Sequence, residues 1–416
     1  MNKICVYTCI TGDYDNLKDI QNNGDINLKT INTNEINKKD ILNYNFEKLF
    51  YDISRIISRN NVYGLKINLR NTIGIEAYEI LGGYSKICSN DSFFSMASCD
   101  PDSSFIYYLR FDDYFKNNDK INFQIAILYT NNFSKNYLRV INYTLYACDS
   151  IDKIIANTDI DVLVKISIMK ELNNINRLEG KKIRENILEK ICESFTTYKK
   201  ETNQISSSQL VLPAQIKFLP IFFNSFFKKG FFNSGKKMCD ITSIIALKHF
   251  FMRCPIYSIL LYLYPKLYEI DINNLNLDTK IRLSAENVRA DRVYISFNGF
   301  YIDLYIFNYL SQEYYNMFLN YENFEECFIN NDNLGETVQN ALNQTELGSK
   351  ILGFIEEKRN ENYGFYSPLR IFFVQKEDAL HLKELKALLI EDELNSEGSY
   401  CNELFLLHNR IENNLK

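Results

Sequence analysis

The spacing of apolar residues changes along this chain, and that change constrains the fold more than any single motif. Between residues 71 and 145, short runs rich in β-branched and aromatic residues, such as Phe123–Tyr129 and Leu138–Leu145, are separated by Asn, Asp and Gly. This pattern is typical of a β-sandwich. From 146 to 262 the apolar residues recur at helical spacing, which predicts an all-helical domain.

Strand-like segments return after residue 262. Val293–Phe297 and Tyr301–Phe307 flank Asn298-Gly299, and Asn-Gly between two apolar runs is a strong signal for a β-hairpin. Leu347–Arg359 has the spacing of an amphipathic helix, and Leu369–Val374 reads as a buried strand. We therefore expect a small α/β domain over 263–382, followed by helices over 383–416.

The N-terminal segment has a different pattern of apolar and polar residues. Ile4–Ile10 is a continuous apolar run, as in a strand buried on both faces. Residues 21–45 are polar and rich in Asn, which predicts a loop, and the apolar positions of Phe46–Ser58 fit a helix that faces a sheet. Residues 1–70 therefore read as the end of an α/β layer, and the chain as a whole as an α+β multidomain protein, because 416 residues exceed one ordinary core.

The charge gives no case for a nucleic-acid partner. The net charge is −5, whereas nucleic-acid binders usually present a basic patch. A local basic cluster, Lys228, Lys229, Lys236 and Lys237, flanks an aromatic run. Its simplest interpretation is a solvated loop, and contact with an anionic lipid surface is the alternative.

The sequence offers no motif for a metal or cofactor, so we expect neither. The ten cysteines include no Cys-x-x-Cys pair, and the three histidines, His249, His381 and His408, lack metal-ligand spacing. Free cysteines suit a reducing compartment. The sequence lacks a nucleophile elbow and the glycine-rich loops that hold phosphates.

Hydrophobic segments are too short to cross a membrane. The longest apolar run, Ile256–Tyr264, lies between Pro255 and Pro265 and is far shorter than the ~20 residues that a membrane helix requires. The N-terminus has no usual signal peptide. The Phe-rich stretch Phe218–Phe232 is predicted to be a core helix, with Phe218, Leu219, Phe222, Phe223 and Phe226 on its buried face.

One enzyme interpretation stays open. Residues 6–15, Val-Tyr-Thr-Cys-Ile-Thr-Gly-Asp-Tyr-Asp, are similar to the opening strand of some nucleotide-sugar glycosyltransferases. The similarity covers fewer than 20 residues, and no Asp-x-Asp motif follows in a matching α/β pattern.

A second resemblance runs through nearly the whole chain in order. The segments Ile4–Asp19, Phe46–Asn60, Ile73–Ala77, Phe123–Thr130, Leu138–Leu145, Gln209–Pro213, Phe218–Pro220, Tyr264–Tyr268, Leu283–Glu286, Tyr366–Val374, Leu389–Asp392 and Ser399–His408 carry it. In this order they resemble the C-terminal portion of the cargo-adaptor subunit of the COPII vesicle coat, the Sec-twenty-four family.

The resemblance implies domain boundaries. Residues 1–70 would be a remnant of the family's trunk domain, 71–145 its β-sandwich, 146–262 its helical domain and 263–382 its gelsolin-like domain. Residues 383–416 would supply C-terminal helices that complete the helical domain.

The resemblance also implies a function. The chain would be a non-enzymatic scaffold that selects membrane cargo for ER-to-Golgi transport, cytoplasmic and peripheral on the endoplasmic reticulum membrane and on COPII vesicles. Its partners would be the cytoplasmic tails of membrane cargo and the GTPase-activating subunit of the inner coat. Pairing with that subunit would be weak, because the trunk carries much of the contact.

Two departures from the family matter. The zinc finger and most of the trunk have no counterpart in this sequence, which leaves a truncated, degenerate paralogue as an alternative. The family also places two arginines where this chain has Ile80 and Gly82, and those arginines bind acidic sorting signals. Ile127 keeps an apolar position of that pocket and is the candidate cargo-binding residue.

Overall fold

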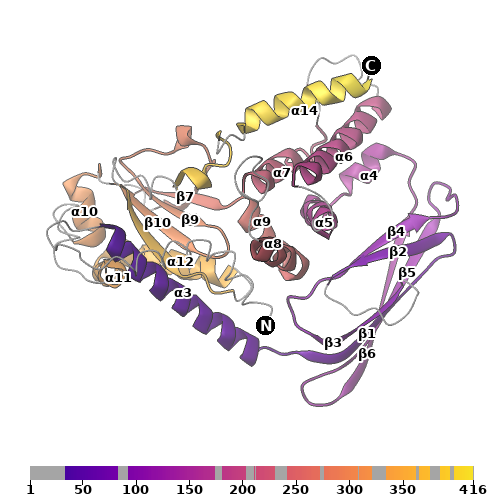
Figure 1. The fold of residues 1–416 in the computed structure, drawn as a ribbon, viewed down its shortest axis with the longest axis horizontal. Helices are drawn as coiled ribbons and strands as arrows, with labels where there is room; N and C mark the ends of the chain where they lie inside the picture. The colour runs from indigo at the N-terminus through magenta and orange to yellow at the C-terminus, as the bar shows by residue number, and fades with distance from the viewer. Residues whose placement is uncertain are drawn as a thin grey trace.

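The computed structural model describes residues 33–82, 92–173, 180–202, 210, 212–229, 241–271, 276–307, 309–320, 334–361, 365–374, 385–393 and 398–415. Figure 1 shows three bodies: a β-sandwich, a group of helices, and a layered α/β body on the opposite side. The first described element, helix α3 (Thr33–Ser58), runs along the α/β body and leads directly into the sandwich.

The sandwich strands are β1 (Val62–Asn71), β2 (Ile75–Leu81), β3 (Phe93–Cys99), β4 (Ile106–Phe111), β5 (Lys120–Thr130) and β6 (Asn136–Tyr146). Within the described residues, β3-β1-β5-β6 form an antiparallel sheet and β2-β4 a second sheet. The core between them contains Leu65, Ile67, Ile80 and Phe94. Strand β1 lies before residue 71, where we expected the sandwich to begin, because its alternating pattern pairs it with both β3 and β5.

Helix α3 differs from the sequence prediction in two ways. It begins at Thr33, so part of the polar segment that we expected to be a loop is helical. Its apolar positions do not all face inward: Phe46, Phe50 and Ile57 are 64, 67 and 78% exposed. Lys48 and Asp52 are buried instead, because the Lys48 ammonium reaches Asp52 at 3.5 Å and donates to the Tyr366 carbonyl at 2.8 Å.

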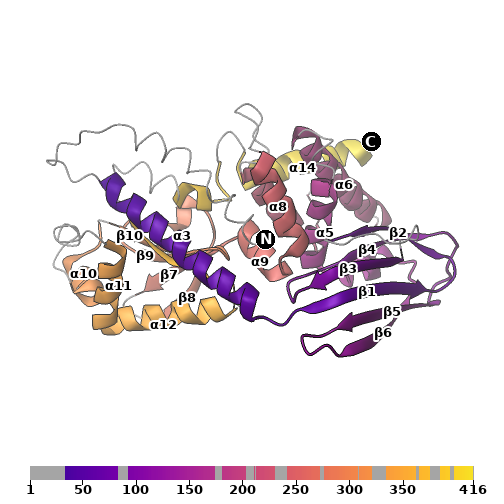
Figure 2. The ribbon, with the colours of Figure 1, turned by 60° about the horizontal axis from the view of Figure 1, so that its bottom comes forward.

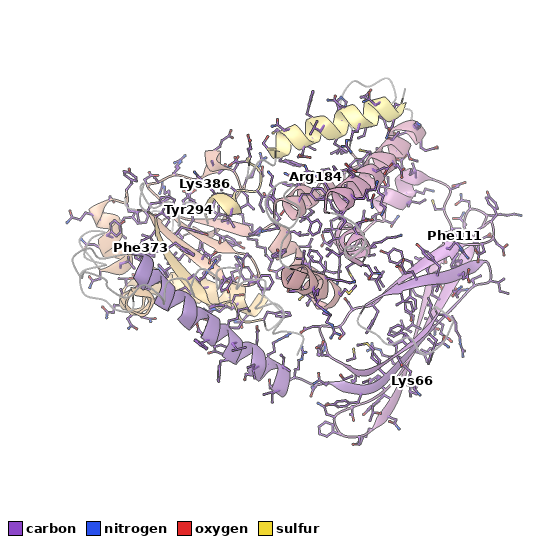
Figure 3. The ribbon with its side chains drawn as sticks, in the orientation of Figure 1. Lys66, Phe111, Arg184, Tyr294, Phe373 and Lys386 are labelled. Carbon is purple, nitrogen blue, oxygen red and sulfur yellow. The ribbon has the colours of Figure 1, made fainter. Side chains whose placement is uncertain are left out.

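The helical domain contains α4 (Ile151–Ala156), α5 (Ile160–Asn173), α6 (Gly180–Glu201), α7 (Leu219–Lys228), α8 (Ile241–Arg253), α9 (Ile256–Leu263) and the C-terminal helix α14 (Tyr400–Leu415). Helix α14 lies along α6 and contacts α7. Its Leu407 and Ile411 join the same core as Ile183 and Ile187 of α6. Figure 3 labels Arg184 of α6, which donates to Glu403 of α14 at 2.9 Å.

The Phe-rich helix α7 is buried on nearly every side. Phe223, Phe226 and Phe227 are at most 2% exposed, whereas Phe218, which we placed on the buried face, is 55% exposed. Phe226 packs edge-on against Phe251 of α8 at 5.7 Å between ring centroids. The prediction of a core helix is confirmed. The expected buried face was wrong in part, because Phe218 is exposed and Phe227, outside that face, is buried.

The basic cluster beside α7 is not a solvated loop where the structure describes it. Lys228 is 5% exposed, and its ammonium donates to the carbonyls of Ile390 and Asp392 at 2.8 and 2.6 Å. The Lys229 ammonium lies 5.0 Å from the ring centre of Tyr262. Lys228 therefore fixes the segment before α14 and is not available to a lipid surface; Lys236 and Lys237 lie outside the described residues.

The α/β body, expected over 263–382, is a mixed sheet with helices. Its elements are β7 (Lys266–Asp271), β8 (Asn276–Ile281), the short helix η2 (Ala285–Asn287), β9 (Val293–Phe297), β10 (Ile302–Phe307), α10 (Gln312–Leu319), α11 (Leu334–Gln344), α12 (Glu346–Glu361) and β11 (Leu369–Val374). In the described part of the chain the sheet order is β11-β10-β9-β7-β8, with β10 and β11 parallel. Figure 2 shows α12 beneath the sheet and α3 crossing in front of it.

The hairpin predicted at Asn298-Gly299 connects β9 and β10. Gly299 has φ of 84°, a left-handed conformation that suits glycine. The Asn298 side chain accepts from the backbone N–H groups of Phe300 and Tyr301 at 2.9 and 2.8 Å. This turn also positions Phe300 against α8, where its ring centre lies 5.1 Å from that of Phe250.

Candidate functional site

A cavity of about 200 Å³ lies where α3, the turn after β3 and helix α8 meet. Its lining is Ile56, Arg59, Asn61, Ser98, Cys99, Asp100, Asp102, Ser103, His249, Phe250, Arg253, Cys254 and Phe365. We call this cavity the junction pocket. It joins residues from the start, middle and end of the chain, so its shape depends on how the domains are held together.

One wall of the junction pocket is a set of ion pairs. Asp102 is 8% exposed and accepts from the Arg55 guanidinium at 2.6 and 2.8 Å and from Arg59 at 2.6 Å. Arg59 also bonds Asp100. The Asp100 carboxylate in turn accepts from the Asp102 N–H and the Ser103 hydroxyl, both at 3.0 Å. These contacts fix α3 to the sandwich and satisfy both carboxylates.

The opposite wall carries a cation that these carboxylates do not pair. The Nε of Arg253 is buried and has no hydrogen-bond partner among the described residues. His249 lies one turn earlier on α8, and its pKa is lowered by burial and by the neighbouring Arg253 and Lys248. Of the charged residues that line the pocket, Arg59 pairs with Asp100 and Asp102, whereas Arg253 has no ion pair among the described residues. An unpaired buried donor of this kind favours an anionic ligand group.

Apolar side chains complete the junction pocket. Phe250 and Phe365 both line it, and the Arg55 guanidinium lies 4.2 Å from the Phe365 ring centre. Pockets for drug-sized ligands usually measure roughly 300–1,000 Å³, so this smaller cavity suits one or two side chains. The combination of a cation and aromatic walls fits a carboxylate next to an apolar side chain.

A smaller enclosure lies beside the junction pocket and has a structural role. Lys48, Asp52 and Ser258 line it together with Gly299 and Phe300 of the hairpin. Burial lowers the pKa of Lys48, and Asp52 Oδ1 has no hydrogen-bond partner among the described atoms. The enclosure measures about 20 Å³, which is the size of a single water site.

The family-derived candidate residues lie away from the junction pocket's lining. Ile127 is on β5, opposite Ile67 of β1 and Arg139 of β6, and it packs partly against the sandwich core. Ile80 is 5% exposed in that same core. Gly82 has φ of 148°, and a Cβ there would lie 3.0 Å from the Ser104 carbonyl oxygen. An arginine therefore does not fit at residue 82 in this backbone.

The remaining candidates from the sequence are not gathered into one site. Of the histidines, His249 lines the junction pocket, His408 lies on α14, and His381 falls outside the described residues. Within the described ranges, no group of three or more His, Cys, Asp or Glu is placed to hold a metal ion. None of the helices in those ranges is long and apolar enough to span a bilayer.

The sequence did not point to Arg59, Asp102 or Arg253. They are separated by 43 and about 150 positions along the chain, and neither a motif nor a periodic pattern connects them. Within the pocket's lining, the sequence singles out His249, as one of three histidines. A prediction of this pocket would have required the packing of α3 and α8 against the sandwich.

Two family models match the chain. The Sec23/Sec24 β-sandwich domain matches residues 62–147, and the Sec23/Sec24 helical domain matches residues 159–261. The first match begins at strand β1 and ends just after β6, as the observed sheet does.

Curated relatives extend the match over most of the chain. Human Sec24C is 21% identical over 370 residues, covering 88% of this chain and 33% of the relative. Sec24 A of Arabidopsis thaliana is 20% identical, covering 88% of this chain and 36% of the relative. Yeast SED5-binding protein 3 is 29% identical over 127 residues, 30% of this chain and 14% of the relative.

The solved structures agree in fold. The crystal structure of the human COPII-coat protein Sec24c matches with a TM-score of 0.75 at 20% identity, covering 89% of this chain and 47% of that chain. The chain spans about a third of the length of the curated relatives named above whose matches extend over most of it. The order of sandwich and helical domains, the relatives and the shared fold together show that this chain resembles the Sec24 proteins over most of its length.

Proposed function

We propose that this chain acts as a COPII-coat cargo adaptor in ER-to-Golgi transport, as a scaffold without catalytic activity, peripheral on the cytoplasmic face of the endoplasmic reticulum membrane. The observation that carries the proposal is the fold shared with Sec24c over 89% of the chain. The name of the yeast relative, SED5-binding protein 3, supports a role in binding another protein.

The site that we assign to cargo is the junction pocket. A cytoplasmic tail would place a carboxylate against Arg253 and an adjacent apolar side chain against Phe250 and Phe365. Charge-assisted hydrogen bonds to arginine are among the stronger polar contacts in proteins. The positions of Ile80 and Gly82 contribute no cation, so an acidic signal that depends on arginines there is expected to bind weakly. Contact of cargo with Ile127 remains a prediction.

Capture on beads that display cytoplasmic tails of ER-exported membrane proteins tests this function. The full chain is expected to bind particular tails and not their scrambled versions. Arg253→Ala should reduce capture, whereas Arg289→Ala, at an exposed position outside the pocket's lining, should leave it unchanged. Failure of the chain to bind any tail better than its scrambled control would contradict cargo selection.

Pairing with the GTPase-activating coat subunit is a separate prediction, and we expect it to be weak. Stable complexes usually bury ~1,200–2,000 Å² in total, and in the family much of that contact belongs to the trunk. Here α3 is the described element of that region, and the strand-like Ile4–Ile10 lies outside the described residues. Saturable one-to-one binding in a pull-down with that subunit would show that another surface makes the contact.

The alternative functions have less support. The glycosyltransferase similarity rested on residues 6–15, which fall outside the described residues. Release of nucleotide from a sugar-nucleotide donor by the purified chain would favour that alternative. A degenerate paralogue would show the fold and bind no cargo tail, so the bead capture also distinguishes it.

A further inference from the structure

A second hollow of the molecule lies in the helical domain, between α6 and α14, and we call it the α6–α14 groove. It measures about 720 Å³, within the roughly 300–1,000 Å³ that is usual for ligand sites. Its two walls are described helices that lie side by side in Figure 1. The lining is polar, carries charges of both signs and shares no residue with the junction pocket.

Ion pairs between the helices fix the register of the two walls. Arg184 pairs with Glu403 near the start of the helices, and Lys199 pairs with Glu412 near their ends. Because the residue numbers rise together in these pairs, α6 and α14 run in the same direction. Arg410 of α14 therefore lies level with the C-terminal half of α6, and each end of the groove has its own set of charges.

The end of the groove toward the start of α6 is acidic. Glu185, Glu189 and Glu193 line it from successive turns, about 6 Å apart along the helix axis. None of these carboxylates has an ion pair within the described part of the chain. Lys182 lines the outermost turn and does not pair with them either. Like charges at this spacing repel one another, so a positively charged ligand group would stabilise this end.

The other end of the groove is basic and rich in donors. Lys200 of α6 lines it together with Arg410 and Asn413 of α14. Neither of these two cations has an ion pair among the residues that the structure describes. Thr196 belongs to the same end and is 5% exposed. Guanidinium, ammonium and hydroxyl groups all donate to carboxylates, so this end suits an acidic ligand group.

The Thr196 hydroxyl is an independent sign that a ligand atom belongs in the groove. It is buried and has no hydrogen-bond partner among the described atoms. Ser194 and Thr197 of the same helix donate to the carbonyls four residues earlier, both at 2.8 Å. A buried hydroxyl without a partner costs free energy. Rotation about its Cα–Cβ bond would present this hydroxyl to an acceptor in the groove.

We propose that the α6–α14 groove binds an extended peptide segment that carries a basic residue four positions from an acidic residue. The basic side chain lies against Glu185 and Glu189, and the acidic side chain accepts from Arg410 and the Thr196 hydroxyl. The axial distance between these two places on α6 is roughly 13 Å. Four residues of a strand span the same distance at ~3.3 Å each, and residues four apart point to the same face.

A peptide satisfies this groove better than a simple ion does. A metal ion or a polyamine would pair with the carboxylates and leave Arg410 and Lys200 unpaired. An inorganic anion would satisfy only the basic end. A segment with both charges pairs with both ends, and its backbone amides can bond the side-chain amides of Asn413 and Asn414, which line the groove.

Fluorescence anisotropy with the full chain tests the groove. The probe is a dye-labelled peptide with blocked ends, Lys-Thr-Ser-Thr-Glu. In one comparison peptide the glutamate is replaced by glutamine, and in the other it is moved one position toward the lysine. We expect saturable one-to-one binding of the probe and about tenfold weaker binding of either comparison peptide. No saturation at millimolar concentration, or equal binding of all three peptides, would overturn the proposal.

Variants of the chain locate the binding. Thr196→Val keeps the side chain's shape and removes a hydroxyl that has no partner, so the melting temperature should not fall while the probe binds about tenfold more weakly. Ser194→Ala, outside the lining on the same helix, is the control and should bind normally. Arg410→Gln should also weaken binding, whereas the exposed Arg289→Gln should not. A lower melting temperature with unchanged binding in Thr196→Val would show that the hydroxyl serves the fold and would contradict the site.

Discussion

Strands β10 and β6 are both rich in apolar residues, yet the fold treats them in opposite ways. All six residues of β10 are buried and all eleven residues of β6 are exposed. β10 has β9 and β11 on its two edges, with Ile302 and Leu304 in one core and Tyr305 in another. β6 has β5 on one edge and no described strand on the other. The number of covering layers, and not the composition of the strand, decides its burial.

This contrast extends to the domains. Figure 3 labels Tyr294 and Phe373, which are buried in the sheet of the α/β body, and Lys66 and Phe111, which are exposed on the sandwich. Phe111 is 65% exposed, whereas Phe373 is 3% exposed. Most of the large exposed apolar residues in the described part of the chain lie on the sandwich, and fewer lie on the helical domain and the α/β body. Such surface is where binding to another chain is expected.

The largest difference should appear when a phenylalanine of the closed helical core is removed. Phe226 is fully buried and Phe218 is 55% exposed, although both belong to the same Phe-rich stretch. Phe226→Ala should lower the free energy of unfolding by about 3–5 kcal/mol, and Phe218→Ala by much less. Chemical denaturation measures both, and liposome association should be unchanged in both. Lost liposome binding at unchanged stability would instead indicate a membrane role for α7.

The buried ion pairs that join α3 to the sandwich should contribute more to stability than an exposed ion pair on the sandwich. Removing one partner of a buried pair typically costs about 3–5 kcal/mol, so Asp102→Ala should unfold the chain more easily. Glu76, whose pair with Arg110 on β4 is exposed, is the control, and Glu76→Ala should leave the denaturation midpoint nearly unchanged. Equal effects of the two substitutions would mean that Arg55 and Arg59 do not depend on Asp102.

Isoleucines in the two strands offer a matched comparison. Ile306 of β10 is fully buried and Ile141 of β6 is 40% exposed. Ile306→Ala should cost about 2–5 kcal/mol, because it leaves a cavity, and Ile141→Ala should cost clearly less. Thermal unfolding compares them. A cost for Ile141→Ala that equals the cost for Ile306→Ala would show that β6 is covered.

A smaller effect should depend on pH. The Lys165 ammonium on α5 donates to the Ser104 hydroxyl and to the Cys254 carbonyl, both at 2.8 Å, and burial lowers its pKa from 10.5 to about 8. Between these values the unfolded chain binds more protons than the folded chain, so stability should rise with pH, by up to about 3 kcal/mol. Lys165→Met should reduce this slope. Part of it should remain, because burial also lowers the pKa of Lys229 to about 8. An identical slope in the variant would contradict the assignment.

The local elements were largely predictable from the sequence. The Asn298-Gly299 turn, strands β5, β6 and β11 and helix α12 follow from turn chemistry and apolar spacing, which act over a few residues. The start of α3 at Thr33 did not follow, because its polar residues give no apolar pattern. The exposure of β6 was also not predictable, since an apolar strand reads the same whether or not other strands cover it.

Most of the candidate site could not be predicted from the sequence. In the sequence, Lys228 is typical of a solvated residue. In the structure its ammonium donates to carbonyls more than 160 positions away. Arg253 is a candidate binding residue because the fold brings it to the same pocket as Arg59 and Asp102, which come from other parts of the chain. Such long-range pairs depend on how the domains pack. The family resemblance predicted the domains but not these contacts.

Binding of a peptide to the junction pocket can be measured by calorimetric titration of the full chain. The probe is a short peptide with an apolar residue beside a free C-terminal carboxylate, and the control is the same peptide with an amidated C-terminus. We expect one-to-one binding that amidation or Arg253→Ala weakens about tenfold or more, equal to ~1.4 kcal/mol. Equal affinity for both peptides, unchanged in Arg253→Ala, would contradict it.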